Sequence, residues 1–165
     1  MNIGLLGQNV GLALCNAFYI GEKTPEDELL VPFGIFFTEN ETNMVPFEAN
    51  SQAEAIEMGR NVIAHNEEHW SGWCYGREGL VNLEDGSKHD AFIFEAKLKD
   101  MSKPLILIQL FEYPFRLSGK LIVNMPSELN NVFVQNRGLF VNSLHDGARS
   151  HKQGGPSWEK WEQLV

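Results

Sequence analysis

The sequence predicts a single α+β domain built on an antiparallel sheet. Its 165 residues are one domain's length of chain. Apolar residues recur at helical spacing near the N-terminus and again over residues 51–69, and strand-like runs joined by short turns follow. Strands joined by short turns pair antiparallel, because parallel neighbours need a long crossover. The chain shows no internal repeat and no sign of a second core, so we expect one domain.

The first predicted element is a helix over residues 8–19. Residues 1–20 carry no charge, so a secretory signal has to be weighed against a helix. The segment lacks a basic start, and its apolar stretch is interrupted by Gln8, Asn9 and Asn16. We therefore expect a buried first helix. No run of 18 apolar residues occurs, which argues against a membrane span.

A hairpin and a capped helix are expected next. Residues 31–38 are a continuous apolar run typical of a buried strand, and residues 44–47 can return beside them. Ser51 and Glu54 match a capping box, the signature of a helix N-terminus. The main helix that they begin extends over residues 51–69, with its apolar residues on one side.

A β-meander should follow the main helix. Residues 88–99 alternate apolar and polar side chains, which predicts a strand with one solvated face. Residues 104–113 are apolar on both faces, which predicts the central strand of the sheet. The other predicted strands cover residues 73–83 and 119–124, and Glu84-Asp85-Gly86 forms the turn of the first hairpin.

The C-terminal part is expected to be less regular. Pro126 and Ser127 begin a short helix, and residues 139–144 form either a last strand or a helical turn. Residues 1–144 would then make up the α+β domain. Residues 145–165 are polar and Gly-rich at first, and we expect a partly mobile C-terminal extension that ends in an amphipathic turn.

The charge of the chain is negative and unevenly distributed. There are 13 basic and 22 acidic residues, a net charge of −9. Residues 21–100 hold 17 acidic and 6 basic residues, net −11, whereas residues 101–165 hold 5 acidic and 7 basic residues, net +2. Nucleic acids and anionic membranes require a basic patch, so neither is expected as a direct partner. The two cysteines have no metal-binding or redox spacing and are expected to be reduced, as in a cytosolic protein.

Acidic and aromatic residues after the main helix are the candidate partner-binding residues. Their carboxylates would meet the basic side chains of a protein partner, and the tryptophans would supply desolvated anchors. A solvated face explains the same charges and core packing the same aromatics, so these alternatives stay open. A free strand edge beside Pro46 or Gly119 could also accept a partner strand. The candidates are Glu67, Glu68, Trp70, Trp73, Glu84, Asp85 and Asp90.

A zinc site is the sharpest alternative motif. His65-Asn66-Glu67-Glu68-His69 matches H-x-x-E-H, in which two histidines one helical turn apart bind zinc and the glutamate activates water. His65, Glu68 and His69 would take these roles in a zinc-dependent hydrolase. The pattern also needs a downstream glutamate ligand, and no glutamate lies between Glu128 and Glu159. We therefore expect no metal.

No coherent catalytic set is visible elsewhere in the chain. There is no G-x-S-x-G nucleophile elbow, and the early glycines do not form a phosphate-binding loop. We expect a binding protein without a cofactor rather than an enzyme. A small-molecule-binding module, with a pocket between the sheet and the helices, is the alternative that we keep beside a protein-binding function.

The chain resembles the small acidic immunity proteins that bacteria pair with toxic nuclease domains, such as those of contact-dependent growth inhibition systems. The resemblance covers most of the chain and lies in its size, its acidity and its helix-plus-meander organisation rather than in a motif. It implies a cytoplasmic protein that covers the active site of a cognate basic toxin. Acidic side chains would then meet the lysines and arginines that the toxin uses to bind phosphates.

Overall fold

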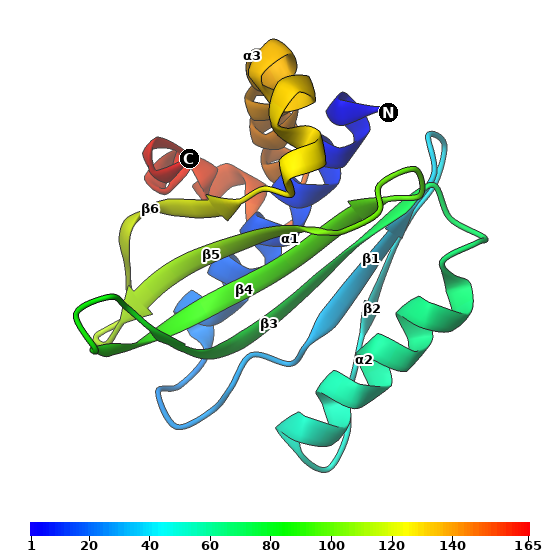
Figure 1. The fold of residues 1–165 in the computed structure, drawn as a ribbon. Coiled ribbons are helices and arrows are strands. Elements are labelled where there is room, and N and C mark those ends of the chain that lie inside the picture. Colours follow the sequence, from blue (N-terminus) through cyan, green and yellow to red (C-terminus); the bar gives the residue numbers. More distant parts are fainter.

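The computed structural model describes residues 1–165 and confirms the α+β class (Figure 1). All strand pairs of its single six-stranded sheet are antiparallel, and the strand order is β2-β1-β3-β4-β5-β6. Helices α1 and α3 lie on one face of the sheet and α2 lies on the other (Figure 1). The elements are α1 (Ile3–Lys23), β1 (Phe33–Phe37), β2 (Thr42–Pro46), α2 (Gln52–Asn66), β3 (Gly72–Asn82), β4 (Lys88–Leu98), β5 (Leu105–Glu112), β6 (Arg116–Asn124) and α3 (Asn130–Arg149), with 3-10 helices at Ser127–Leu129, Gly155–Lys160 and Glu162–Leu164.

Helix α1 is the buried first helix that the sequence predicts, and it extends further in both directions. The Asn2 side chain caps it by accepting a hydrogen bond from the Leu5 backbone N–H at 2.9 Å. Glycines lower helix propensity, but a Cβ atom at Gly11 would overlap the carbonyl of Leu144 in α3. The glycine therefore allows the two helices to approach closely. By length and composition α1 could also cross a membrane, yet 67% of its apolar window is buried inside the protein, as in a core helix.

The first hairpin and the cap of α2 agree with the prediction. Strands β1 and β2 pair over Phe33–Phe37 and Thr42–Pro46. The Ser51 hydroxyl accepts a hydrogen bond from the Glu54 backbone N–H at 3.2 Å and so begins α2. Helix α2 ends at Asn66 rather than at residue 69. It packs over a small second core on its own face of the sheet, consisting of Phe36, Phe47, Ile63, Trp73 and Tyr75.

The centre of the sheet differs from the prediction. Strands β3 and β4 are central, whereas β5, predicted to be central, lies next to the edge strand β6. On the α1 face, β5 buries Leu105, Leu107 and Phe111 completely or nearly so. On the opposite face its aliphatic side chains remain half-exposed, because α2 covers β1 and β3 and does not reach β5. An apolar run therefore indicates two apolar faces, and it does not require both faces to be covered.

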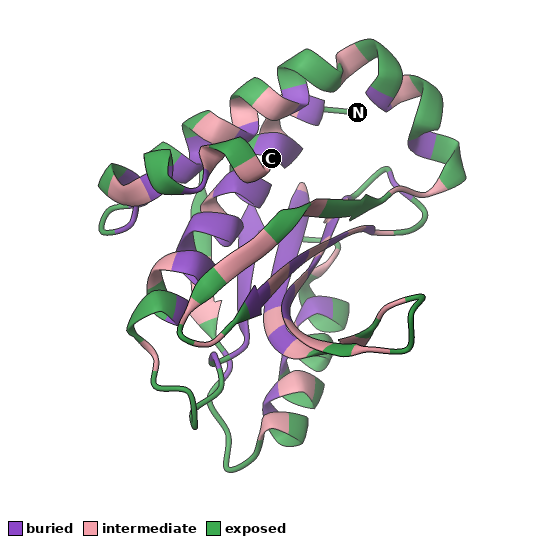
Figure 2. Cartoon of the chain, turned by 90° about the vertical axis from the view of Figure 1, so that its left-hand side faces the viewer, coloured by how far each residue is buried: buried purple, intermediate pink, exposed green.

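The C-terminal part forms more regular structure than the sequence indicates. Residues 139–144 belong to α3, and the helix continues to Arg149. Residues 145–165, predicted to be a partly mobile extension of a 1–144 domain, instead pack into the main core. Trp158 is completely buried and stacks on Phe18 of α1 with ring centroids 6.0 Å apart. Figure 2 shows the buried residues, in purple, on the helices and strands that face each other across this core. Short 3-10 helices carry no 3.6-residue apolar period, so periodicity could not reveal them.

Candidate protein-binding surface

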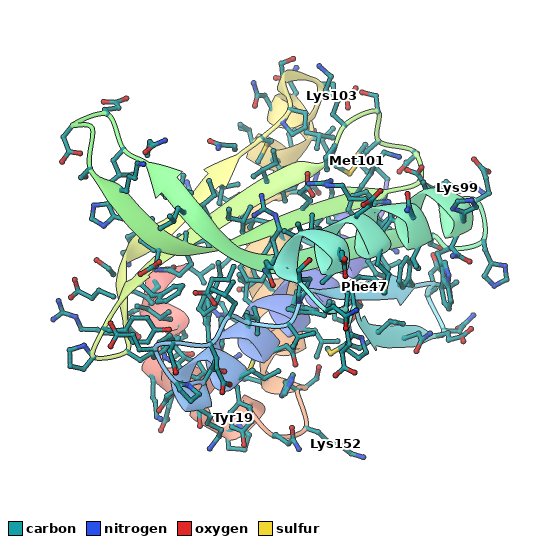
Figure 3. All side chains as sticks on the ribbon, turned by 90° about the horizontal axis from the view of Figure 1, so that it is seen from below. Tyr19, Phe47, Lys99, Met101, Lys103 and Lys152 are labelled. Carbon is teal, nitrogen blue, oxygen red and sulfur yellow. The ribbon has the colours of Figure 1, made fainter.

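The predicted partner-binding residues lie at opposite ends of β3. Glu67, Glu68, Trp70 and Trp73 are at or before its start, whereas the other three follow its end in the β3–β4 hairpin. Strand β3 has 11 residues, so its ends are separated by about 30 Å at the usual rise of about 3.3 Å per residue. Figure 3 shows the hairpin at one end of the sheet and Lys99 at the other. The seven residues therefore do not form one surface.

The two glutamates that precede β3 are each paired with a lysine. The Lys97 ammonium of β4 donates a hydrogen bond to Glu67 at 2.7 Å, and Lys99 lies 3.4 Å from the Glu68 carboxylate. The hydrogen bond from Lys97 lowers the pKa of Glu67 below its usual value, because it stabilises the charged carboxylate. The pair of Glu67 and Lys97 joins the end of α2 to the sheet, whereas the Glu68 side chain is 93% exposed and its pair with Lys99 lies at the surface.

The two tryptophans at this end have a packing role. Trp73 is 8% exposed and belongs to the small core beneath α2. Trp70 is half-buried, and its ring centroid lies 6.0 Å from that of Phe36. Together with the two ion pairs, they make up what we call the α2 joint: Glu67, Glu68, Trp70 and Trp73 with Lys97 and Lys99. The structure supports the packing explanation of the aromatics at this position.

The residues of the zinc motif are not arranged as the motif requires. Helix α2 ends at Asn66, so His69 lies outside the helix and does not stack one turn above His65. The His65 ring instead bonds the Asn61 carbonyl oxygen at 2.7 Å, and His69 lies edge-on against Trp70. Glu68 pairs with Lys99. No group of three metal-ligating side chains comes together in the structure.

The opposite end of the sheet carries carboxylates without cation partners. We call this region the acidic end. It has two separate parts, the β3–β4 hairpin at the left end of the sheet in Figure 1 and the loop between α1 and β1 at the lower left. None of its six carboxylates forms an ion pair. They are Glu26, Asp27 and Glu28 in the loop, and Glu84, Asp85 and Asp90 in the hairpin.

Two buried or half-buried groups link the loop to the hairpin. Glu78 of β3 is 8% exposed and accepts a hydrogen bond from the Leu30 backbone N–H at 2.8 Å. Burial raises the pKa of Glu78, the bond from Leu30 lowers it, and the carboxylate of Asp90 raises it again. Burial also raises the pKa of the Tyr113 hydroxyl, and Glu78, Asp90 and Glu26 add to that rise. Glu26, Glu78 and Asp90 therefore lie near one another, around Tyr113.

The hairpin turn holds its carboxylates in a defined geometry. Gly86 has a φ of +82°, a conformation that L side chains rarely adopt, and its N–H bonds the Leu83 carbonyl at 2.9 Å. Asp85 accepts hydrogen bonds from the hydroxyl and the backbone N–H of Ser87, and these bonds lower the pKa of its carboxyl. A carboxylate fixed in this way loses little conformational freedom when it binds a cation.

Each part of the acidic end carries exposed apolar side chains. Leu80 is 68% exposed and sits opposite Asp90 in the register of β3 and β4, while Leu29 and Val31 flank the buried Leu30. Leu29 and Val31 also line a hollow of about 460 Å³ beside Glu48. Sequence reasoning missed these residues and the loop carboxylates. The available signal was the charge run over residues 22–28 followed by apolar residues that alternate in burial.

Comparison with known proteins does not extend these observations. The chain matches no family model, no curated protein and no solved structure.

Proposed function

We propose that this protein is an inhibitor of the immunity type, which binds a basic toxin domain through its acidic end. The observation that carries the proposal is that the hairpin carboxylates Glu84, Asp85 and Asp90 form no ion pair, and that Asp90 lies opposite the exposed Leu80 in the register of β3 and β4. Carboxylates already paired inside a protein contribute little to a partner, whereas unpaired ones attract a basic surface and raise its association rate. The α2 joint has no part in this surface.

A nuclease toxin is the partner that fits this surface best. Enzymes that cleave nucleic acids bind phosphates with lysine and arginine side chains. The acidic end would cover such a cationic site, with the hairpin carboxylates in the position of the phosphates. Leu80 would supply an apolar contact that is desolvated in the interface. In this proposal the protein acts in the cytoplasm and needs no cofactor.

Affinity capture from a lysate of the source cells tests the proposal first. With the protein as bait, we expect a stoichiometric basic partner whose retention falls steeply as the salt concentration rises, because salt screens exposed charges. The captured protein should lose its nuclease activity when it is titrated with the bait. A captured partner that is acidic, or one that stays active when saturated, would contradict the proposal.

A pair of charge-matched variants then locates the surface. Glu84→Lys/Asp85→Lys reverses two carboxylates of the acidic end, and we expect the affinity for the partner to fall by more than tenfold. Glu39→Lys/Glu41→Lys makes the same charge change at exposed, unpaired residues of the β1–β2 turn, near the start of β3. We expect that control to change affinity by less than threefold. Equal losses in both variants would reject the acidic end as the binding surface.

A further inference from the structure

A second feature, independent of the acidic end, is an apolar cavity between β6 and α3. Its volume is about 440 Å³, within the range of about 300–1,000 Å³ found for small-molecule sites. Nine of its eleven lining residues are apolar. Strand β6 contributes Leu121 and Val123, α3 contributes Phe133, Val134, Phe140, Val141 and Leu144, and Met125 and Val165 complete the apolar lining.

The cavity exists because α3 packs against α1 rather than against β6. Close backbone contact between α1 and α3 is allowed by Gly11 and by Gly147, whose Cβ atom would overlap the Gln8 carbonyl. Helix α3 therefore lies beside α1 (Figure 1), and the cavity is left between α3 and β6. Val123 is 43% exposed and Val134 is 80% exposed as a result. Apolar surface of this kind is costly unless something covers it.

The polar groups of the cavity are few and lie on α3. They are Asn130 and Arg137. Arg137 makes no ion pair, whereas Arg149 on the same helix pairs with Asp146 and Glu162. No acidic side chain lines the cavity. An unpaired guanidinium at an apolar cavity favours an anionic group on the occupant, since arginine binds carboxylates with paired hydrogen bonds.

A partner strand is a poor candidate for the occupant. The pairing of β5 with β6 shifts its register between Ile108 and Leu110 of β5. Gly119 of β6 has a φ of +73°. Bulges and edge lysines such as Lys120 oppose the addition of a further strand. The other free edge, β2, is five residues long and ends at Pro46. Neither free edge therefore favours the strand addition considered from the sequence.

We propose that the cavity binds a medium-chain alkyl carboxylate. Its chain would lie against Leu121, Val123 and Phe140, and its carboxylate would pair with Arg137 at the surface. The first turns of α3 can adjust to such a chain, because the helix is interrupted at Asn136, where φ is −118° and ψ is 16°. There the Asn136 side chain donates a hydrogen bond to the Val132 carbonyl at 2.8 Å.

Calorimetric titration of the whole protein with sodium decanoate, below the concentration at which decanoate forms micelles, tests this proposal. We expect saturable binding at one site and a rise in melting temperature with ligand concentration. Decyltrimethylammonium, which has the same chain and the opposite charge, should bind at least tenfold more weakly. Absence of saturable decanoate binding, or equal binding of the two compounds, would overturn the proposal.

Two matched pairs of variants test whether decanoate binds in the cavity. Arg137→Gln should weaken decanoate binding about tenfold, and Lys152→Gln, which removes an exposed cation outside the cavity, should not. Val134→Glu should abolish binding, whereas Leu139→Glu, at a 52% exposed residue of the same helix that does not line the cavity, should leave it unchanged. These four side chains are exposed, so the fold should tolerate each change.

A second copy of the chain is the competing occupant. If a second copy covered the cavity, the unliganded protein would sediment as a dimer and Val134→Glu would convert it to a monomer. That result, with no effect of decanoate on either species, would overturn the proposal. A monomer whose decanoate binding depends on Val134 and Arg137 would support it.

Discussion

The acidic end and the α2 joint contain the same kind of residue at opposite ends of β3, and they use it differently. At the α2 joint, Glu67 and Glu68 are paired with lysines of β4 and its following turn. At the acidic end, Glu84 and Asp85 project from a hairpin without a cation partner. The comparison shows that carboxylates at the two ends of one strand differ in whether the fold gives them a cation partner.

The largest difference between the two ends should appear in stability. Trp73→Ala removes a side chain that is 8% exposed and should lower the free energy of unfolding by about 3–5 kcal/mol. Leu80→Ala at the acidic end, at a residue 68% exposed, should change it by less than about 0.5 kcal/mol. Urea unfolding of both variants measures these values. A large loss from Leu80→Ala would show that the acidic end is structural and not a free surface.

The fold could be predicted from the sequence where local signals agree with each other. The Ser51 cap, the alternation in β4 and the Glu84-Asp85-Gly86 turn are each specified by residues within a few positions, and the structure contains all three. The position of β5 depends on which faces the helices cover, which is a property of the whole chain. The packing of residues 145–165 depends on long-range partners such as Phe18 and Asn16.

The candidate site was harder to predict for the same reason. The sequence shows that residues 21–100 are acidic, but the pairing of Glu67 with Lys97 joins residues 30 positions apart. Spacing along the chain does not reveal such a pair. The loop that carries the other carboxylates is held against β3 by the bond between Leu30 and Glu78, which joins residues 48 positions apart. Charge composition therefore indicates a kind of partner, whereas the surface that meets it follows from tertiary structure.

Removing the charge of one glutamate at each end should have a moderate effect at the α2 joint only. Glu67→Gln weakens its bond with Lys97, and we expect a loss of at most about 1 kcal/mol, because the Glu67 side chain is 37% exposed and the pair is partly screened. Glu84→Gln should cause no measurable loss. Thermal unfolding at low and high salt tests this difference, which should shrink as salt rises. A loss that does not respond to salt would point to packing rather than charge.

The stability that Glu67→Gln loses should depend on pH in a direction that follows from the pKa of Glu67. The pKa of Glu67 is lowered in the folded protein, so its ion pair contributes stability above the unfolded-state pKa. That contribution is lost as the pH falls through the folded-state pKa. The difference in unfolding free energy between the wild type and Glu67→Gln should therefore be largest near neutral pH and decrease in acid. Unfolding curves between pH 7 and pH 3 measure it, and a difference that grows in acid would contradict the pairing with Lys97.

The smallest expected effect has the opposite sign and lies at the acidic end. Burial raises the pKa of Glu78 in the folded protein, so the folded state binds more protons than the unfolded state between the two pKa values. Stability therefore falls as the pH rises through that window. Glu78→Gln keeps an acceptor for the Leu30 N–H and removes the buried charge, so it should make the protein slightly more stable at neutral pH. The gain should vanish in acid, where the wild-type carboxyl is neutral. A variant less stable than the wild type at pH 7 would show that the charge of Glu78 supports the fold, and the acidic end would then resemble the α2 joint.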